Sequence, residues 1–321
     1  MSKSEETFVG AIDQGTSSTR FLIFNVKGQI VASHQVEYEN HYAKAGWVEK
    51  SPTEILESVD TAVAGTCRRF NSLGYDTAQI KGVGITNQRE TTVAFDSETG
   101  EPLTNAIIWN DVRTKELVHR LIDEAGSSTR FASICGLPIT TYFSAVKMRW
   151  MLENVPEVKA AREKGTLRFG TIDTWLVYKM TGNYITDVTN ASRTMLMDIK
   201  TFKWSEECLD FFGVKVDELP EIRSSAEVYG NINEGRLKDI PIGGCLGDQQ
   251  AAMVGQSCFD PGEAKNTYGT GCFMLFNTGE EPIFSKNGLL TTVAFQMGPK
   301  AQPKYALEGS IAVAGSAIQW L

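Results

Sequence analysis

Two short polar turns, each held between apolar runs, restrict the possible folds of this 321-residue chain most strongly. The first has the sequence IDQGTSSTR at residues 12–20 and separates the β-prone runs 8–12 and 21–24. Apolar runs joined by a polar turn are typical of a β-hairpin. Residues 264–276 repeat this layout around a Gly-Thr-Gly turn. The sequence therefore indicates the start of an internal duplication.

The segments between these hairpins predict strands first and then strands alternating with helices. Ser51, Pro52 and Glu54 supply an N-cap serine, a proline at the first helical position and a glutamate at the capping-box position, so a long amphipathic helix follows them. We also expect strands at 30–37, 80–86, 92–95, 106–109, 288–295 and 305–309, and helices at 113–124, 145–153, 171–180 and 312–321. This order predicts an α/β fold with mixed sheets flanked by helices.

Composition excludes several classes of protein. The net charge is −8 and no dense Lys/Arg run occurs, which argues against a nucleic-acid surface. The six cysteines form no CxxC pair, and the three histidines have no metal-ligand spacing. No apolar run reaches membrane-spanning length and residues 1–6 have no apolar signal core, so we expect a cytoplasmic protein without a membrane-spanning segment.

The turn of the first hairpin has the chemistry of a phosphate site. Backbone N–H groups and small hydroxyls can surround a phosphate, and Asp13 at the strand end can hold a metal or its water. An ordinary polar turn is the alternative for one hairpin alone. Two such hairpins favour a nucleotide lying between similar halves. No GxxxxGK[ST] loop or complete dinucleotide fingerprint competes with this interpretation.

Three other places could carry chemistry, and each has a simpler explanation. Arg89 and Glu90 follow an apolar strand and could bind neighbouring hydroxyls, or they could form a surface ion pair. Asp248 follows a glycine-rich run and could be a general base or a helix N-cap. Trp109 and Phe273 could flank a small ligand or belong to the core.

Taken together, six blocks closely resemble the glycerol kinases of the carbohydrate-kinase family, from residue 8 to residue 321. The blocks are DQGT at 13–16, GWVE at 46–49, NQRET at 87–91, TNASRTM at 189–195, GDQQ at 247–250 and KNTYGTGCF at 265–273. The resemblance implies an actin-like/ribonuclease-H-like ATPase fold. It also implies an N-terminal domain over 1–255 and the beginning of a C-terminal domain over 256–321.

The resemblance further implies transfer of the ATP γ-phosphoryl group to glycerol, with Mg²⁺. Asp248 would be the base, and the glycerol site would comprise Arg89, Glu90, Trp109, Tyr142, Asp248, Gln249 and Phe273. Asp13 would position Mg²⁺ through water. The ATP site would comprise Asp13, Gln14, Gly15, Thr16, Ser17, Ser18, Arg20, Gly269, Thr270, Gly315 and Gln319.

Glycerol kinases are longer than this chain, so we expect an incomplete second domain and impaired nucleotide binding. The full-length form is expected to be a homo-oligomer. Two alternatives stay open: a non-catalytic fragment that binds glycerol or pairs with full-length subunits, and an actin/Hsp70-like ATPase without a polyol substrate. Residues 231–238 are short where bacterial relatives carry a regulatory loop, so the resemblance does not extend to that regulation.

Overall fold

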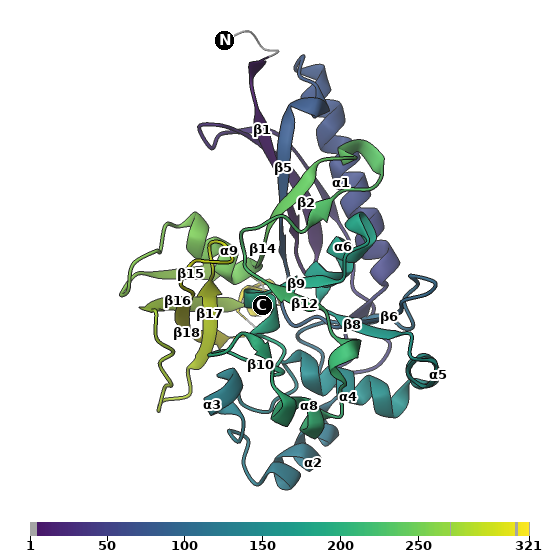
Figure 1. Ribbon diagram of the computed structural model, residues 1–321, viewed down its shortest axis with the longest axis vertical. Coiled ribbons are helices and arrows are strands. Elements are labelled where there is room, and N and C mark those ends of the chain that lie inside the picture. Colours follow the sequence, from purple (N-terminus) through teal and green to yellow (C-terminus); the bar gives the residue numbers. More distant parts are fainter. Residues whose placement is uncertain (1–4, 270, 312–313, 321) are drawn as a thin grey trace.

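A computed structural model describes residues 5–269, 271–311 and 314–320. A six-stranded mixed sheet and a separate four-stranded antiparallel sheet form its two main parts (Figure 1). Helices cover the larger sheet and fill the region below both sheets in that view. The predicted α/β architecture is therefore observed.

The larger sheet contains the first predicted hairpin. Its strands, in spatial order, are β13 (Gly230–Asn231), β14 (Pro241–Gly247), β5 (Ile80–Asn87), β1 (Phe8–Gln14), β2 (Ser18–Asn25) and β3 (Ile30–Glu37). Strands β1, β5 and β14 run parallel, and the β1–β2–β3 meander is antiparallel. Because parallel neighbours end at the same edge, the residues after β1, β5 and β14 meet there.

Helix α1 (Pro52–Ser72) packs on the larger sheet as predicted. The Ser51 side chain accepts a hydrogen bond from the Glu54 backbone N–H at 3.4 Å, and Pro52 is the first helical residue. The Glu54 carboxylate instead pairs with Lys50 and with His41, 3.3 Å away. Helix α6 (Ile172–Thr181) lies beside α1, since Trp175 Nε1 donates to the Pro52 carbonyl at 2.9 Å.

The region below the two sheets in Figure 1 is mainly helical. Its helices are α2 (Lys115–Ala125), α3 (Ala132–Cys135), α4 (Ser144–Asn154), α5 (Pro156–Lys164), α7 (Val188–Ala191) and α8 (Glu206–Phe212). Paired short strands link it: β4 (Glu49–Lys50) with β7 (Ala106–Ile107), β6 (Val93–Asp96) with β8 (Leu167–Gly170), β9 (Ile185–Asp187) with β12 (Glu221–Arg223), and β10 (Met197–Asp198) with β11 (Lys203–Trp204). The 3₁₀ turns are Thr77–Gln79, Val216–Glu218 and Gly235–Leu237.

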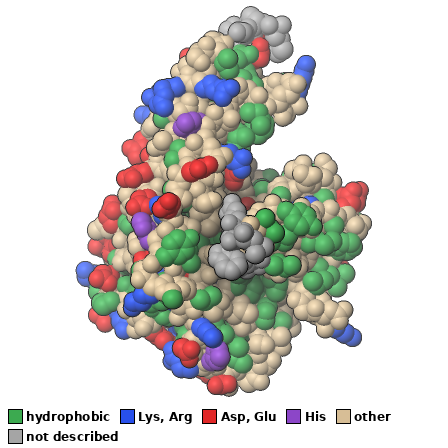
Figure 2. Space-filling view, turned by 180° about the vertical axis from the view of Figure 1, so that it is seen from behind, with side chains coloured by type: hydrophobic (Ala, Val, Ile, Leu, Met, Phe, Trp, Pro, Cys, Tyr) green, Lys and Arg blue, Asp and Glu red, His purple; other side chains and the backbone are tan. Residues whose placement is uncertain are grey.

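The second predicted hairpin opens the smaller sheet. After α9 (Asp248–Gly255), the sheet runs in the order β15 (Ala264–Tyr268), β16 (Cys272–Gly279), β18 (Lys304–Ile311) and β17 (Leu290–Phe295), and α10 (Gly315–Trp320) follows. One face packs Phe273 and Leu275 inward, whereas Met274 and Phe276 are exposed. Figure 2 shows apolar side chains gathered on the surface of this part.

Among the described residues, no helix is long and apolar enough to cross a membrane.

Candidate active site

A cavity of about 170 Å³ lies between the tips of the two hairpins. Thr16 contributes from the first tip, and Gly269 and Gly271 contribute from the second. All seven residues predicted for the glycerol site line this one cavity, together with Gln88 and Thr267. The seven are Arg89, Glu90, Trp109, Tyr142, Asp248, Gln249 and Phe273.

Glu90 is held in an uncommon backbone conformation beyond the end of β5. Its φ is 59°, in the left-handed region that disfavours residues with a side chain. The Glu90 carbonyl accepts hydrogen bonds from Ser144 Oγ at 3.1 Å and Thr92 Oγ1 at 3.0 Å. Such a conformation persists where surrounding contacts enforce it, often at functional sites. Arg89 and Glu90 are both buried, so the surface ion-pair interpretation is wrong.

Arg89 is oriented by a carboxylate of the second sheet. Glu308 on β18 accepts from Arg89 Nη1 at 2.6 Å and from Nη2 at 3.0 Å, and Gln250 Oε1 lies 3.3 Å from Nη1. Arg89 Nε lies 3.5 Å from Asp248 Oδ1 and 3.9 Å from Glu90 Oε1. Glu308 therefore holds the Nη1/Nη2 edge of the guanidinium. The Nε edge faces Asp248 and Glu90.

A second buried arginine completes the network. Arg193 Nε donates to Glu90 Oε1 at 2.6 Å, and Arg193 Nη2 donates to Glu308 Oε1 at 3.0 Å. Burial raises the pKa of Glu308, but Arg193 and Arg89 outweigh burial and hold that pKa at about 2. Glu308 is therefore ionised and pairs with both arginines, since buried charges need partners.

Asp248 has the environment of a proton acceptor. Gly247, not Asp248, is the N-cap of α9, so the N-cap interpretation of Asp248 is wrong. Oδ2 of Asp248 accepts from Gln249 Nε2 at 3.2 Å, and the side chain is 36% exposed in the cavity. Burial raises the pKa of Asp248, and the Arg89 charge opposes that rise. A carboxylate with a raised pKa is a better general base than a fully solvated one.

Three aromatic side chains form one wall of the cavity. Trp109 packs edge-to-face on Tyr142 and on Phe273, with ring centroids 5.5 Å and 5.8 Å apart. Trp109 Nε1 also donates to Thr16 Oγ1 at 2.8 Å. The core and ligand-wall interpretations therefore both hold for Trp109 and Phe273, because these rings are buried and line the cavity.

The residues predicted for the ATP site are not all on this cavity. Thr16 and Gly269 line it, and the Gly315 N–H donates to the Gly269 carbonyl at 3.0 Å. Gly15 closes the first turn through its N–H to the Ser18 carbonyl at 2.9 Å. Ser17 and Ser18 line a separate open hollow. Thr270 and the Gln319 side chain lie outside the described part of the chain.

Gln14 supports the first tip from beneath. Its side chain is fully buried, donates to the Gly15 carbonyl at 2.9 Å, contacts the Tyr38 hydroxyl and accepts from Gln88 Nε2 at 3.1 Å. These bonds leave Gln14 as a support of the turn. We infer no direct ligand contact from its side chain.

Residues 8–255 match the N-terminal domain of the FGGY family of carbohydrate kinases, and residues 264–321 match its C-terminal domain. The chain belongs to the FGGY family of carbohydrate kinases. The predicted carbohydrate-kinase membership and its actin-like/ribonuclease-H-like fold are thereby confirmed.

Relatives of this FGGY chain include a Caenorhabditis elegans protein named probable glycerol kinase, 51% identical over 98% of this chain and 63% of that protein. An Arabidopsis thaliana glycerol kinase is 53% identical over 99% of this chain and 62% of its own length. The crystal structure of Plasmodium falciparum glycerol kinase with ADP has a TM-score of 0.91 at 41% identity, covering 98% of this chain and 63% of that one. The FGGY chain thus spans slightly less than two thirds of the length of these relatives.

The donor chemistry at the first tip of the FGGY chain fits Mg²⁺. Asp13 is 31% exposed, and its Oδ2 lies 3.1 Å from Arg20 Nη2 across the β1–β2 ladder. Burial raises the pKa of Asp13, and Arg20 opposes this. Mg²⁺ keeps several waters and binds through one or two carboxylates plus substrate phosphates, so a single carboxylate here suffices.

Sequence reasoning missed the charges behind the cavity of the FGGY chain. Glu308, Arg193 and Lys265 are buried and contact cavity residues, but none was predicted as a site residue. One signal was available: Glu308 interrupts an otherwise apolar strand at 305–309. A charge in a buried strand needs a partner, although the sequence does not say which one.

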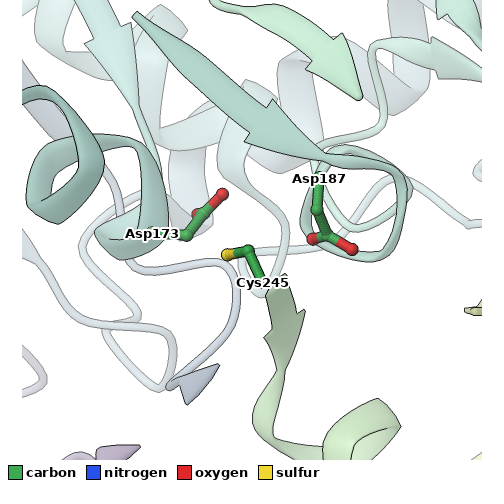
Figure 3. A group of neighbouring side chains, drawn as sticks. All are labelled: Asp173, Asp187 and Cys245. Atoms are coloured by element: carbon green, nitrogen blue, oxygen red, sulfur yellow. The ribbon is translucent and has the colours of Figure 1, made fainter. Parts of the chain in front are cut away.

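A second group of titratable side chains lies away from the cavity. Asp173, Asp187 and Cys245 point toward one another, with ligand atoms within 4.8 Å (Figure 3). Their carboxylates already accept hydrogen bonds, for example Asp173 from Thr186 Oγ1 at 2.6 Å and Asp187 from the Asn190 N–H at 2.9 Å. Burial, and then Asp173, raise the pKa of Asp187 to about 7. These bonds explain the group as part of the core packing, and we assign it no metal.

Proposed function

We propose that this protein transfers the γ-phosphoryl group of ATP to a hydroxyl of glycerol, giving sn-glycerol 3-phosphate. One observation carries the proposal: all seven residues predicted for glycerol, which come from five separate places in the sequence, line one small cavity. Relatives at 51% and 53% identity that are named glycerol kinase support the choice of substrate.

In this proposal, the polyol lies with its carbon skeleton against Trp109 and Phe273 and its hydroxyls toward Arg89 and Glu90. Arg89 presents its Nε edge to the cavity because Glu308 holds the other edge. Glu90 supplies an acceptor, and Tyr142 closes the wall. A site of charged hydrogen-bonding groups around a small volume favours a small polyol over larger sugars.

Asp248 then accepts the proton of the attacking hydroxyl. The nucleophilic oxygen of glycerol attacks the γ-phosphorus as the bond to the β–γ bridging oxygen breaks, and ADP leaves. Phosphoryl transfer depends mainly on alignment and charge neutralisation, with one base near the nucleophile. The raised pKa of Asp248 suits that role.

The phosphates are proposed to lie between Thr16 and Gly269, which line the polyol cavity from the two hairpin tips. Asp13 would hold Mg²⁺ through water, and the ion would neutralise phosphate charge when bound. Gly315 and α10 would approach the nucleoside, since Gly315 is hydrogen-bonded to Gly269. Ser17, Ser18, Arg20, Thr270 and Gln319 stay predictions for the ATP site.

The test is glycerol-dependent ADP formation with ³¹P NMR of the product, in parallel with xylulose and gluconate. We expect glycerol 3-phosphate and much lower rates with the two sugars. Calorimetry with ATP on residues 1–321 measures how much nucleotide affinity this stretch has. An ATPase without a polyol substrate would release ADP equally with and without glycerol, and a non-catalytic fragment would bind glycerol without releasing ADP.

A further inference from the structure

Lys265 is a buried lysine on β15 whose three partners all line the cavity. It is 6% exposed. Its ammonium donates to Gln249 Oε1, to Thr267 Oγ1 at 3.0 Å and to the Phe273 carbonyl at 3.3 Å. Gln249 lies on α9, whereas Thr267 and Phe273 lie on the second hairpin. One cation therefore joins the cavity residues of two parts of the fold.

The contact with Gln249 determines which way its amide points. An ammonium can only donate, so it selects the amide oxygen of Gln249 and turns the amide nitrogen away. That nitrogen, Nε2, donates to Asp248 Oδ2 at 3.2 Å. With the amide reversed, an oxygen would face the Asp248 carboxylate and repel it.

Lys265 is cationic at neutral pH despite its burial. Burial, and then Arg89, lower the pKa of Lys265 to about 8, while Asp248 and Glu308 act in the opposite direction. The charge thus remains near Asp248 over the neutral range. It favours the ionised form of that carboxylate.

We propose that Lys265 is a positioning residue that fixes the Gln249 amide so that it donates to Asp248. This inference rests on the proposed function, in which Asp248 is the base. Lys265 itself does not line the cavity. It acts through Gln249, with Thr267 and Phe273 as its other anchors.

The test is a double-mutant cycle with Lys265→Met, Gln249→Leu and the double variant. We expect Lys265→Met to lower kcat on the order of 10-fold or more and to shift the acid limb of the kcat/KM profile to higher pH. In the Gln249→Leu protein, adding Lys265→Met should lower kcat much less, because the residue through which Lys265 acts is already gone. Lys304→Met, which breaks only the exposed pair with Glu280, is the matched control and should leave the profile unchanged.

The inference is overturned if the two single-variant reductions in kcat multiply in the double variant, or if the pH profile of Lys265→Met is unshifted. The proposed function would stand in either case. Absence of glycerol phosphorylation in the unmodified protein would instead reject the proposed function. A second measurement needs neither turnover nor the Lys265 variant. ¹³C NMR titration of labelled lysine side chains should show a lower Lys265 pKa in Gln249→Leu than in the unmodified protein, and an unchanged pKa would contradict the Lys265–Gln249 coupling.

Discussion

Glu308 binds Arg89 through both carboxylate oxygens, at 2.6 Å and 3.0 Å, across 219 positions of sequence. Arg89 follows β5 of the larger sheet, whereas Glu308 lies on β18 of the smaller one. The orientation of the guanidinium in the cavity therefore depends on the placement of the two sheets. The same carboxylate also binds Arg193, which in turn holds Glu90.

Replacing Glu308 with Gln should weaken both stability and polyol binding. The change keeps the shape but leaves two buried arginines with one carboxylate fewer, and breaking a buried pair costs about 3–5 kcal/mol. Denaturant unfolding measures the free energy, and calorimetry with glycerol measures the affinity. The control is Glu280→Gln, which removes the exposed ion pair of Glu280 with Lys304, a residue on the same strand as Glu308. It should lower the free energy of unfolding by less than about 1 kcal/mol. Equal effects of the two changes would argue against the buried network.

Acid should remove the stabilisation that Glu308 provides. Its folded-state pKa is about 2 against an ordinary 4.5, so its contribution is complete above pH 4.5 and is lost as the pH falls toward about 2. Unfolding free energies of the unmodified protein and of Glu308→Gln should therefore converge over that window. A gap that stays constant as the pH falls below 4.5 would show that ionised Glu308 is not responsible.

Gly247→Ala should displace Arg89. A Cβ at position 247 would lie 2.7 Å from Arg89 Cγ and 2.8 Å from Cδ, closer than carbon atoms approach. We expect glycerol affinity to fall by about 10-fold or more, since 1.4 kcal/mol of displacement energy already has that effect. Gly243→Ala on the same strand is the control, because nothing lies within 4 Å of its added Cβ. Calorimetry should separate the two variants, and similar affinities would contradict the steric argument.

Trp109→Phe should disconnect the first hairpin tip from the aromatic wall. The change keeps a ring but removes the 2.8 Å bond to Thr16 Oγ1, a loss of about 1 kcal/mol. If Thr16 contacts phosphate, kcat should fall about fivefold. Trp204→Phe removes a comparable bond to the Pro220 carbonyl, remote from the cavity, and should not change kcat. A normal rate in Trp109→Phe would mean that this bond does not matter for transfer.

The sequence predicted the local elements well because their signals are local. Short apolar, β-prone runs on either side of a polar turn predict β1 and β2, and Ser51-Pro52 starts α1 where the structure does. The buried network could not be predicted in the same way. The roles of Glu308 and Arg193 depend on contacts with residues far away in the chain. From sequence alone, Lys265 cannot be distinguished from an ordinary strand lysine, because its three partners are not known.

Two alternative interpretations were wrong because they were based on neighbouring residues alone. Arg89-Glu90 as a surface ion pair and Asp248 as a helix N-cap are each reasonable from neighbouring residues alone. The burial of Arg89 and Glu90, their bonds to Glu308 and Arg193, and the placement of Gly247 at the N-cap are known only from the folded chain.

The most direct test of the central claim is Asp248→Asn, assayed for glycerol phosphorylation and for glycerol binding. Asparagine keeps the size of the side chain but cannot accept the proton, and general-base catalysis contributes about 10²–10⁴-fold. We predict that kcat falls by that order while the glycerol dissociation constant, measured by calorimetry, changes less than about 10-fold. An Asp248→Asn protein that phosphorylates glycerol at the unmodified rate would contradict the account.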